Sequence, residues 1–217
     1  MIRDKLKNSS YFENYIISQN QRIQKFTAVL NTLTDDSKIT QCARYLASFY
    51  RNLISAKYSI GASKPEIKRI TEEYLKTLTV CQVSDYEEMV DVLSLVYLLD
   101  FSNIDISYLL NFNVFDDGLV LTLKNFIGGN RSVDTTSLKY PDYYSPFYKY
   151  ISNRMSFESF ANYMNNNWYV SSKESYWYGS HLSDQNIYPG YWCWLAAAML
   201  KAKETTYNSI YIPSEII

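Results

Sequence analysis

The sequence has few of the residues that build tight turns, metal sites and hydrolytic centres. Its 217 residues include only 6 glycines, 5 prolines and 3 cysteines, and His181 is the single histidine. Sparse glycine and proline disfavour an all-β chain, which needs many tight turns. The cysteines are odd in number and far apart, so neither a disulfide framework nor a zinc site is expected. Cys42, Cys81 and Cys193 are predicted to be small buried side chains in a reducing cytosol.

The chain also lacks a surplus of positive charge and a long apolar run. Lys and Arg number 21 against 22 Asp and Glu, which disfavours a general nucleic-acid binder. The longest uncharged stretch, 185–200, is interrupted by Pro189 and Gly190, whereas a bilayer span needs about 20 predominantly apolar residues. No leader with an apolar core is visible at the N-terminus. We therefore expect a cytoplasmic protein without a membrane segment.

The usual catalytic motifs are missing. We find no nucleophile elbow, no zinc-protease motif, no phosphate loop and no dinucleotide fingerprint. Ser180 and His181 are adjacent, but neighbouring side chains rarely form a productive nucleophile–base pair. His181 is predicted to be structural. A small hydrolase or carbohydrate-related enzyme that uses His181 in an aromatic pocket is the alternative.

What is present is helical periodicity. Apolar residues recur at steps of three to four over 12–33, 39–54, 67–78 and 89–97, which is typical of amphipathic helices. Sequences with the spacing of a capping box start at Ser10, Ser63 and Ser84, which predicts helix starts there. Gly61 is expected to end a helix. Shorter helices are expected over 104–112, 117–127, 143–151, 157–167 and 191–203. The predicted fold is an all-α, bundle-like protein with an N-terminal part (1–129) and a C-terminal part (130–217), packed as one unit.

The second part is rich in aromatic residues. Of 36 Phe, Trp and Tyr residues, 18 lie between Tyr140 and Trp194, including all four tryptophans. A stacking platform for a carbohydrate or base is one interpretation, although the few basic residues here disfavour nucleic acid. An aromatic core is the other interpretation. It places Trp192, Trp194 and 196–198 in a buried helix against Trp168 and Trp177.

One charge feature stands out. No Lys or Arg occurs between Lys76 and Lys124, whereas eight acids do: Asp85, Glu87, Glu88, Asp91, Asp100, Asp105, Asp116 and Asp117. A solvated helix face with acids at helix starts is one explanation. A negative patch for a cationic partner is the other, with Glu87, Glu88 and Asp91 projecting from a helix near 86–99. On that hypothesis the partner-binding residues are Asp85, Glu87, Glu88, Asp91, Asp116 and Asp117, and the surface of 140–167 is the fallback.

Two stretches resemble the PoNi immunity proteins, which partner the PoNe family of DNA-degrading toxins. The N-terminal stretch comprises Arg3-Asp4-Lys5, Tyr11-Phe12, Tyr15-Ile16, Arg22-Ile23-x-Lys25-Phe26, Tyr50-Arg51 and Tyr58-Ser59-x-Gly61. The C-terminal stretch comprises Trp168-Tyr169, Lys173, Trp177-Tyr178-x-Ser180-His181, Gly190-Tyr191-Trp192-x-Trp194-x-Ala196-Ala197 and Tyr211-Ile212-Pro213. Leu195 departs from the pattern, in which an acidic residue is usual.

The resemblance implies an all-α, non-catalytic cytoplasmic protein without cofactor or metal that neutralises a DNase toxin. It implies a structural role for the motif residues Trp168, Trp177, Ser180, His181, Gly190, Tyr191, Trp192 and Trp194. The acidic window has the charge that would complement the positive DNA-binding surface of such a toxin. A further hypothesis is an orphan member of the family that protects against the toxins of neighbouring cells.

Overall fold

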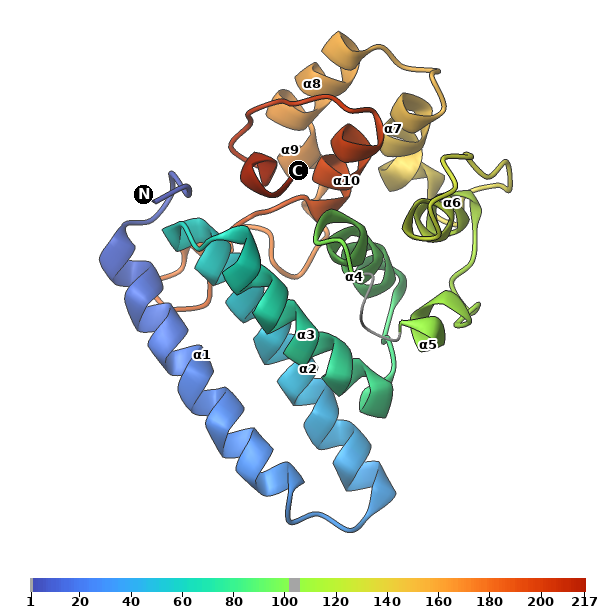
Figure 1. Cartoon of the computed structure of the whole chain (residues 1–217). Helices are drawn as coiled ribbons and strands as arrows, with labels where there is room; N and C mark the ends of the chain where they lie inside the picture. The colour runs from blue at the N-terminus through green and yellow to red at the C-terminus, as the bar shows by residue number, and fades with distance from the viewer. Residues whose placement is uncertain (1, 102–105) are drawn as a thin grey trace. The chain divides into compact units, whose positions relative to one another are not determined.

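The computed structural model describes residues 2–101 and 106–217, and every regular element in these ranges is helical (Figure 1). The only β-type pairing in the described ranges is an isolated bridge between Ser209 and Ile212. The predicted all-α fold is confirmed.

The chain divides into two compact units. The first unit comprises Met1–Ser84 and Gly179–Tyr191, and the second comprises Asp85–Tyr178 and Trp192–Ile217. A short segment from the C-terminal half therefore belongs to the N-terminal unit. The expected division after residue 129 falls inside the second unit, and it stays a prediction about domain organisation.

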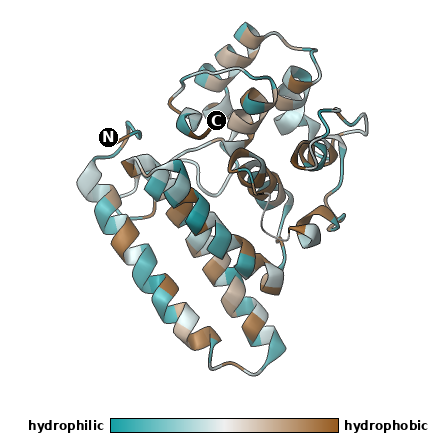
Figure 2. Ribbon diagram, in the orientation of Figure 1, coloured by the Kyte–Doolittle hydropathy of each residue, from teal (hydrophilic) through white to brown (hydrophobic). Residues whose placement is uncertain are grey.

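Three long helices form the first unit. They are α1 (Ser9–Leu30), α2 (Asp36–Ile60) and α3 (Lys64–Cys81), and α2 packs against the other two. In Figure 2 brown apolar stripes alternate with teal polar ones along these helices, as expected for helices with one buried face. The stripe includes Phe12, Ile54, Tyr58, Ile67 and Tyr74, all fully buried.

The helix ends follow local chemistry, with shifts from the predicted boxes. Asn8 caps α1, because its side chain accepts the Tyr11 amide, and Ser10 lies inside the helix. Ser63 caps α3 without a side-chain bond to the backbone. Gly61 ends α2 as predicted, in the left-handed region (φ 103°) that favours glycine.

Seven α-helices have been placed in the second unit, within its described residues. They are α4 (Tyr86–Leu98), α5 (Ser107–Leu110), α6 (Gly118–Ile127), α7 (Pro141–Ile151), α8 (Phe157–Asn166), α9 (Trp168–Ser171) and α10 (Trp194–Ala202). Helix α4 packs against α6 and α10, and α10 also packs against α7. Helices α4 and α6 are brown around most of their circumference in Figure 2. The start of the helix predicted over 104–112 lies outside the described residues.

The last long helix begins three residues later than predicted. Gly190 has a φ of 112°, and Cys193 precedes the helix with φ −84° and ψ 86° while its amide donates to the Tyr211 carbonyl at 2.8 Å. Trp192 is therefore buried but not helical. Trp194 and residues 195–200 form a buried run in α10, as expected for a central helix.

The three cysteines are all buried, as predicted. Across the described ranges no group of three or more His, Cys, Asp and Glu side chains is placed to hold a metal ion. No described helix combines the length and apolar character that a membrane crossing requires.

Candidate functional site

In the first unit, the residues ahead of α1 form hydrogen bonds with the end of α2 and with residues 179–191. The Arg3 guanidinium donates to the carbonyls of Tyr58 (3.1 Å) and Ala62 (2.8 Å) at the end of α2, and lies 4.3 Å from the centre of the Tyr58 ring. This places a cation at a helix C-terminus, where the helix dipole favours it. Residues ahead of α1 are thereby fixed to the end of α2.

Asp4 links this N-terminal segment to residues 179–191. Its carboxylate is buried and accepts the amides of Leu6 (2.7 Å) and Lys7 (3.0 Å) and the Tyr188 hydroxyl (2.6 Å). Burial, reinforced by the Asp4 charge, raises the pKa of Tyr188 far above its ordinary value, so the hydroxyl stays a donor. The Tyr188 amide donates in turn to the Tyr11 hydroxyl at 2.8 Å.

His181 lies at the edge of the same region. Its Nδ1 is 2.9 Å from the Tyr191 hydroxyl, and the Ser180 hydroxyl is 3.2 Å from the same oxygen. Both side chains of the pair considered for catalysis are thus directed to Tyr191. Burial, with a smaller contribution from Lys7, lowers the pKa of His181, while Asp4 acts in the opposite direction.

The acids that begin α4 have unequal surroundings. Asp85 is exposed and caps the helix by accepting the Glu88 amide at 2.8 Å. Glu88 is only 4% exposed, so the expectation that it projects outward is wrong. The reason is that α6 and α10 cover most of the surface of α4. Glu87 and Asp91 lie on a narrow stripe that keeps partial access to solvent. The N-terminal cap is Asp85 rather than Ser84.

The remaining acids of the window are engaged within the second unit. Asp117 is 2% exposed and accepts hydrogen bonds from backbone amides and from a tyrosine hydroxyl. It is therefore not part of an outward-facing patch. Asp116 pairs with Lys124 at 2.6 Å, and Asp100 pairs with Lys201 at 2.6 Å. Asp105 lies outside the described residues.

The tryptophans of the second unit fall into two groups. Trp168 and Trp177 stack on each other with ring centres 5.6 Å apart, and the Trp177 indole donates to Glu87 at 3.2 Å. Trp192, which precedes α10, and Trp194, which begins it, are both buried. That the second pair packs against the first stays a prediction.

Comparison with family models identifies the family of the chain. The N-terminal model of the PoNe immunity protein (PoNi) family matches residues 3–111, and its C-terminal model matches residues 115–208. The chain is a member of the PoNi family. Comparison with curated proteins and with solved structures gave no match.

The PoNi motif positions now have a structural meaning. Asp4 and Tyr11 of the N-terminal motif both bond to Tyr188, whose ring lies 4.6 Å from that of Tyr191 in the C-terminal motif, so Tyr188 links the two motifs within the first unit. Gly190 adopts a positive φ, which other residues rarely adopt.

Two contacts were not foreseen from the sequence. Tyr188 was not among the motif residues, and the Trp177–Glu87 hydrogen bond joins an aromatic motif to the acidic window across 90 positions. Leu195 is 3% exposed, so an acidic residue at this position would be buried. The only sequence signal for the Asp4–Tyr188 contact was indirect. Both residues lie near apolar motif residues, and a polar side chain that is buried there needs a hydrogen-bond partner.

The His181 pKa predicts a pH dependence of stability. Because its folded pKa is below the unfolded value, the unfolded chain binds more protons, and stability falls as pH drops below about 6.5. His181→Gln is expected to unfold at a lower temperature than wild type at pH 7.5, with the difference narrowing at pH 5.5. Thermal melts at both pH values test this, and a difference that stays constant or widens would contradict it.

Proposed function

We propose that this PoNi protein neutralises a DNA-degrading PoNe toxin by covering the cationic surface with which the toxin holds DNA. It would act in the cytoplasm, without cofactor and without catalysis of its own. A DNase must present Lys and Arg to phosphates, so that surface is required for every substrate. An inhibitor with carboxylates there competes with DNA directly.

The observation that supports this proposal is the division of charge between the two units. The first unit has 13 Lys and Arg against 8 Asp and Glu, a formal net charge of +5. The second has 8 against 14, a formal net charge of −6. The near-neutral chain thus contains one acidic unit, and we assign the toxin-binding surface to this unit.

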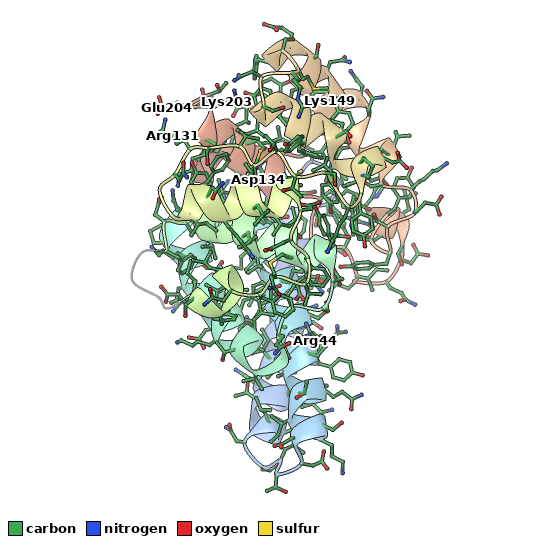
Figure 3. The ribbon with its side chains drawn as sticks, turned by 90° about the vertical axis from the view of Figure 1, so that its right-hand side faces the viewer. Arg44, Arg131, Asp134, Lys149, Lys203 and Glu204 are labelled. Carbon is green, nitrogen blue, oxygen red and sulfur yellow. The ribbon has the colours of Figure 1, made fainter. Side chains whose placement is uncertain are left out.

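Several basic residues of the second unit are neutralised locally. Arg131 and Glu204 form an ion pair at 2.6 Å, and Figure 3 shows them together with Lys203. Lys124 and Lys201 also pair with acids of the unit. Of the predicted binding residues, Asp85, Glu87, Asp91 and Asp116 keep accessible surface. Because Asp116 is paired with Lys124, we retain the other three for toxin contact.

The first test is inhibition. The purified protein is expected to block plasmid cleavage by the PoNe toxin when the two are mixed at a one-to-one ratio. Full cleavage in the presence of excess protein would contradict the proposed function, and binding to a different PoNe toxin only would indicate an orphan member.

Charge reversal then tests the surface. Glu87→Lys combined with Asp91→Lys should reduce the association rate roughly tenfold at low salt, because opposite charges steer the encounter. The effect should shrink at high salt, where screening is stronger. Binding kinetics across a salt series measure this.

The matched control reverses two exposed acids of the first unit, Glu13→Lys with Asp184→Lys, and so changes the net charge equally. It should leave association nearly unchanged. Equal slowing by both pairs would mean that net charge, rather than this surface, steers the toxin.

A further inference from the structure

The segment 168–178 of the second unit presents large apolar side chains to solvent. Tyr176 is 79% exposed, Val170 59% and Tyr178 38%. Tyr176 is the most exposed large apolar side chain of the described residues. Single exposed apolar residues are ordinary, but three within nine residues indicate a contact surface.

The backbone of this segment is held by successive turns. The Ser172 amide donates to the Tyr169 carbonyl (3.1 Å), the Ser175 amide to Ser172 (2.8 Å), and the Tyr178 amide to Ser175 (3.0 Å). The buried Ser172 hydroxyl donates to the Trp168 carbonyl at 2.9 Å. A segment that is ordered before binding loses little conformational freedom when a partner arrives.

The rings are also ordered against each other. Tyr169 stacks on Tyr178 with centres 4.5 Å apart, and on Tyr211 at 5.9 Å with nearly parallel planes. The buried Trp168 stacks on Trp177. We call the half-buried Tyr169 and the exposed Val170, Tyr176 and Tyr178 the tyrosine platform.

Acids border the tyrosine platform. The Trp177 ring lies 6.4 Å from that of Tyr169 in the platform, and its indole donates to Glu87, which places the accessible stripe of α4 beside the platform. Glu174 and Lys173 are both exposed within the segment itself, and Lys173 is the only Lys or Arg between Arg154 and Lys201 in the sequence. The surroundings therefore match a partner surface rich in Arg and Lys.

We infer that the tyrosine platform is the energetic centre of the toxin contact, with the carboxylates of Glu87 and Asp91 at its rim. This inference rests on the proposed function. Tyr and Trp dominate the centres of protein interfaces, and charges at the rim govern the encounter. Arginine side chains also bind the faces of tyrosine rings, so a DNA-binding surface supplies suitable partners.

Dissociation kinetics separate this role from electrostatic steering. Tyr176→Ala with Tyr178→Ala should raise the dissociation rate from a catalytically inactive PoNe toxin at least tenfold, with the association rate and its salt dependence unchanged. Tyr176→Ala alone, at the more exposed position, should raise it at least threefold. Circular dichroism and thermal melts confirm that each variant is folded.

Tyr45→Ala is the matched control, because Tyr45 is 48% exposed on α2 of the first unit. It should leave both rates unchanged. If wild type binds the toxin and both platform variants dissociate at the wild-type rate, the inference is overturned while the proposed function stands. If wild type does not bind, the proposed function itself has failed.

Two further outcomes would also overturn the inference. One is a loss of affinity in the platform variants that lies wholly in the association rate. The other is a wild-type protein that self-associates in solution and becomes monomeric in the platform variants, which would assign the platform to a second copy of the chain. Light scattering over a concentration series detects the latter.

Discussion

Trp194→Ala is expected to lower the free energy of unfolding of the second unit by about 3–5 kcal/mol. Trp194 is 3% exposed and is the first residue of α10. This helix packs against α4 and α7, and its next turn contains the small residues 196–198. Because the indole is almost fully buried and the neighbouring alanines contribute little volume, its loss leaves a cavity that close-packed neighbours cannot fill.

Tryptophan fluorescence makes this measurement specific to one unit. All four tryptophans belong to the second unit, so fluorescence follows its unfolding in urea, whereas far-ultraviolet circular dichroism follows both units. Three tryptophans remain in the variant to report. If the unfolding transitions followed by fluorescence and by circular dichroism no longer coincide in the variant, only the second unit has been weakened.

Tyr176→Ala is the control for Trp194→Ala, because it also removes a large aromatic side chain from the second unit. Tyr176 is 79% exposed, so the expected change is within about 0.5 kcal/mol. Equal midpoints for wild type and Trp194→Ala would place the indole on the surface. A stacking platform at this position would then regain support.

Local chemistry explains which parts of the fold were predictable. The periodicity of apolar residues identified the long helices, since each has one buried stripe, and Gly61 marked a helix end because its backbone requires positive φ. The start of α1 was misplaced because Asn8 and Ser10 are both good capping residues and sequence alone does not choose between them. The start of α10 was misplaced because an apolar run fits an extended segment and a helix equally well.

The candidate site was less predictable because it depends on pairings over long separations. Glu88 was expected to be exposed, since one apolar stripe on α4 leaves the other side for solvent. Two helices cover α4 instead, and the carboxylate is buried. The Asp4–Tyr188 hydrogen bond spans 184 residues, and periodicity has no information about such pairs.

Asp117→Ala is expected to destabilise the second unit by about 3 kcal/mol, since it removes a helix cap and leaves buried donors without an acceptor. One carboxylate oxygen accepts the amides of Leu119 and Val120, each at 2.9 Å, at the start of α6. The other accepts the Tyr86 hydroxyl at 2.7 Å and the Lys139 amide at 2.9 Å. A single buried side chain therefore connects the starts of α4 and α6 with the loop before α7.

The buried surroundings decide the size of the effect. Burial, with the Asp117 hydrogen bond, raises the pKa of Tyr86 far above its ordinary value, so this hydroxyl remains a donor that needs an acceptor. Asp85→Ala is the matched control, because Asp85 also caps a helix of the unit but is exposed. Water can replace the Asp85 oxygen, so about 1 kcal/mol is expected there. Urea unfolding followed by tryptophan fluorescence compares the two variants. If Asp117→Ala loses no more free energy of unfolding than Asp85→Ala, Asp117 acts as a cap alone and does not hold the three segments together.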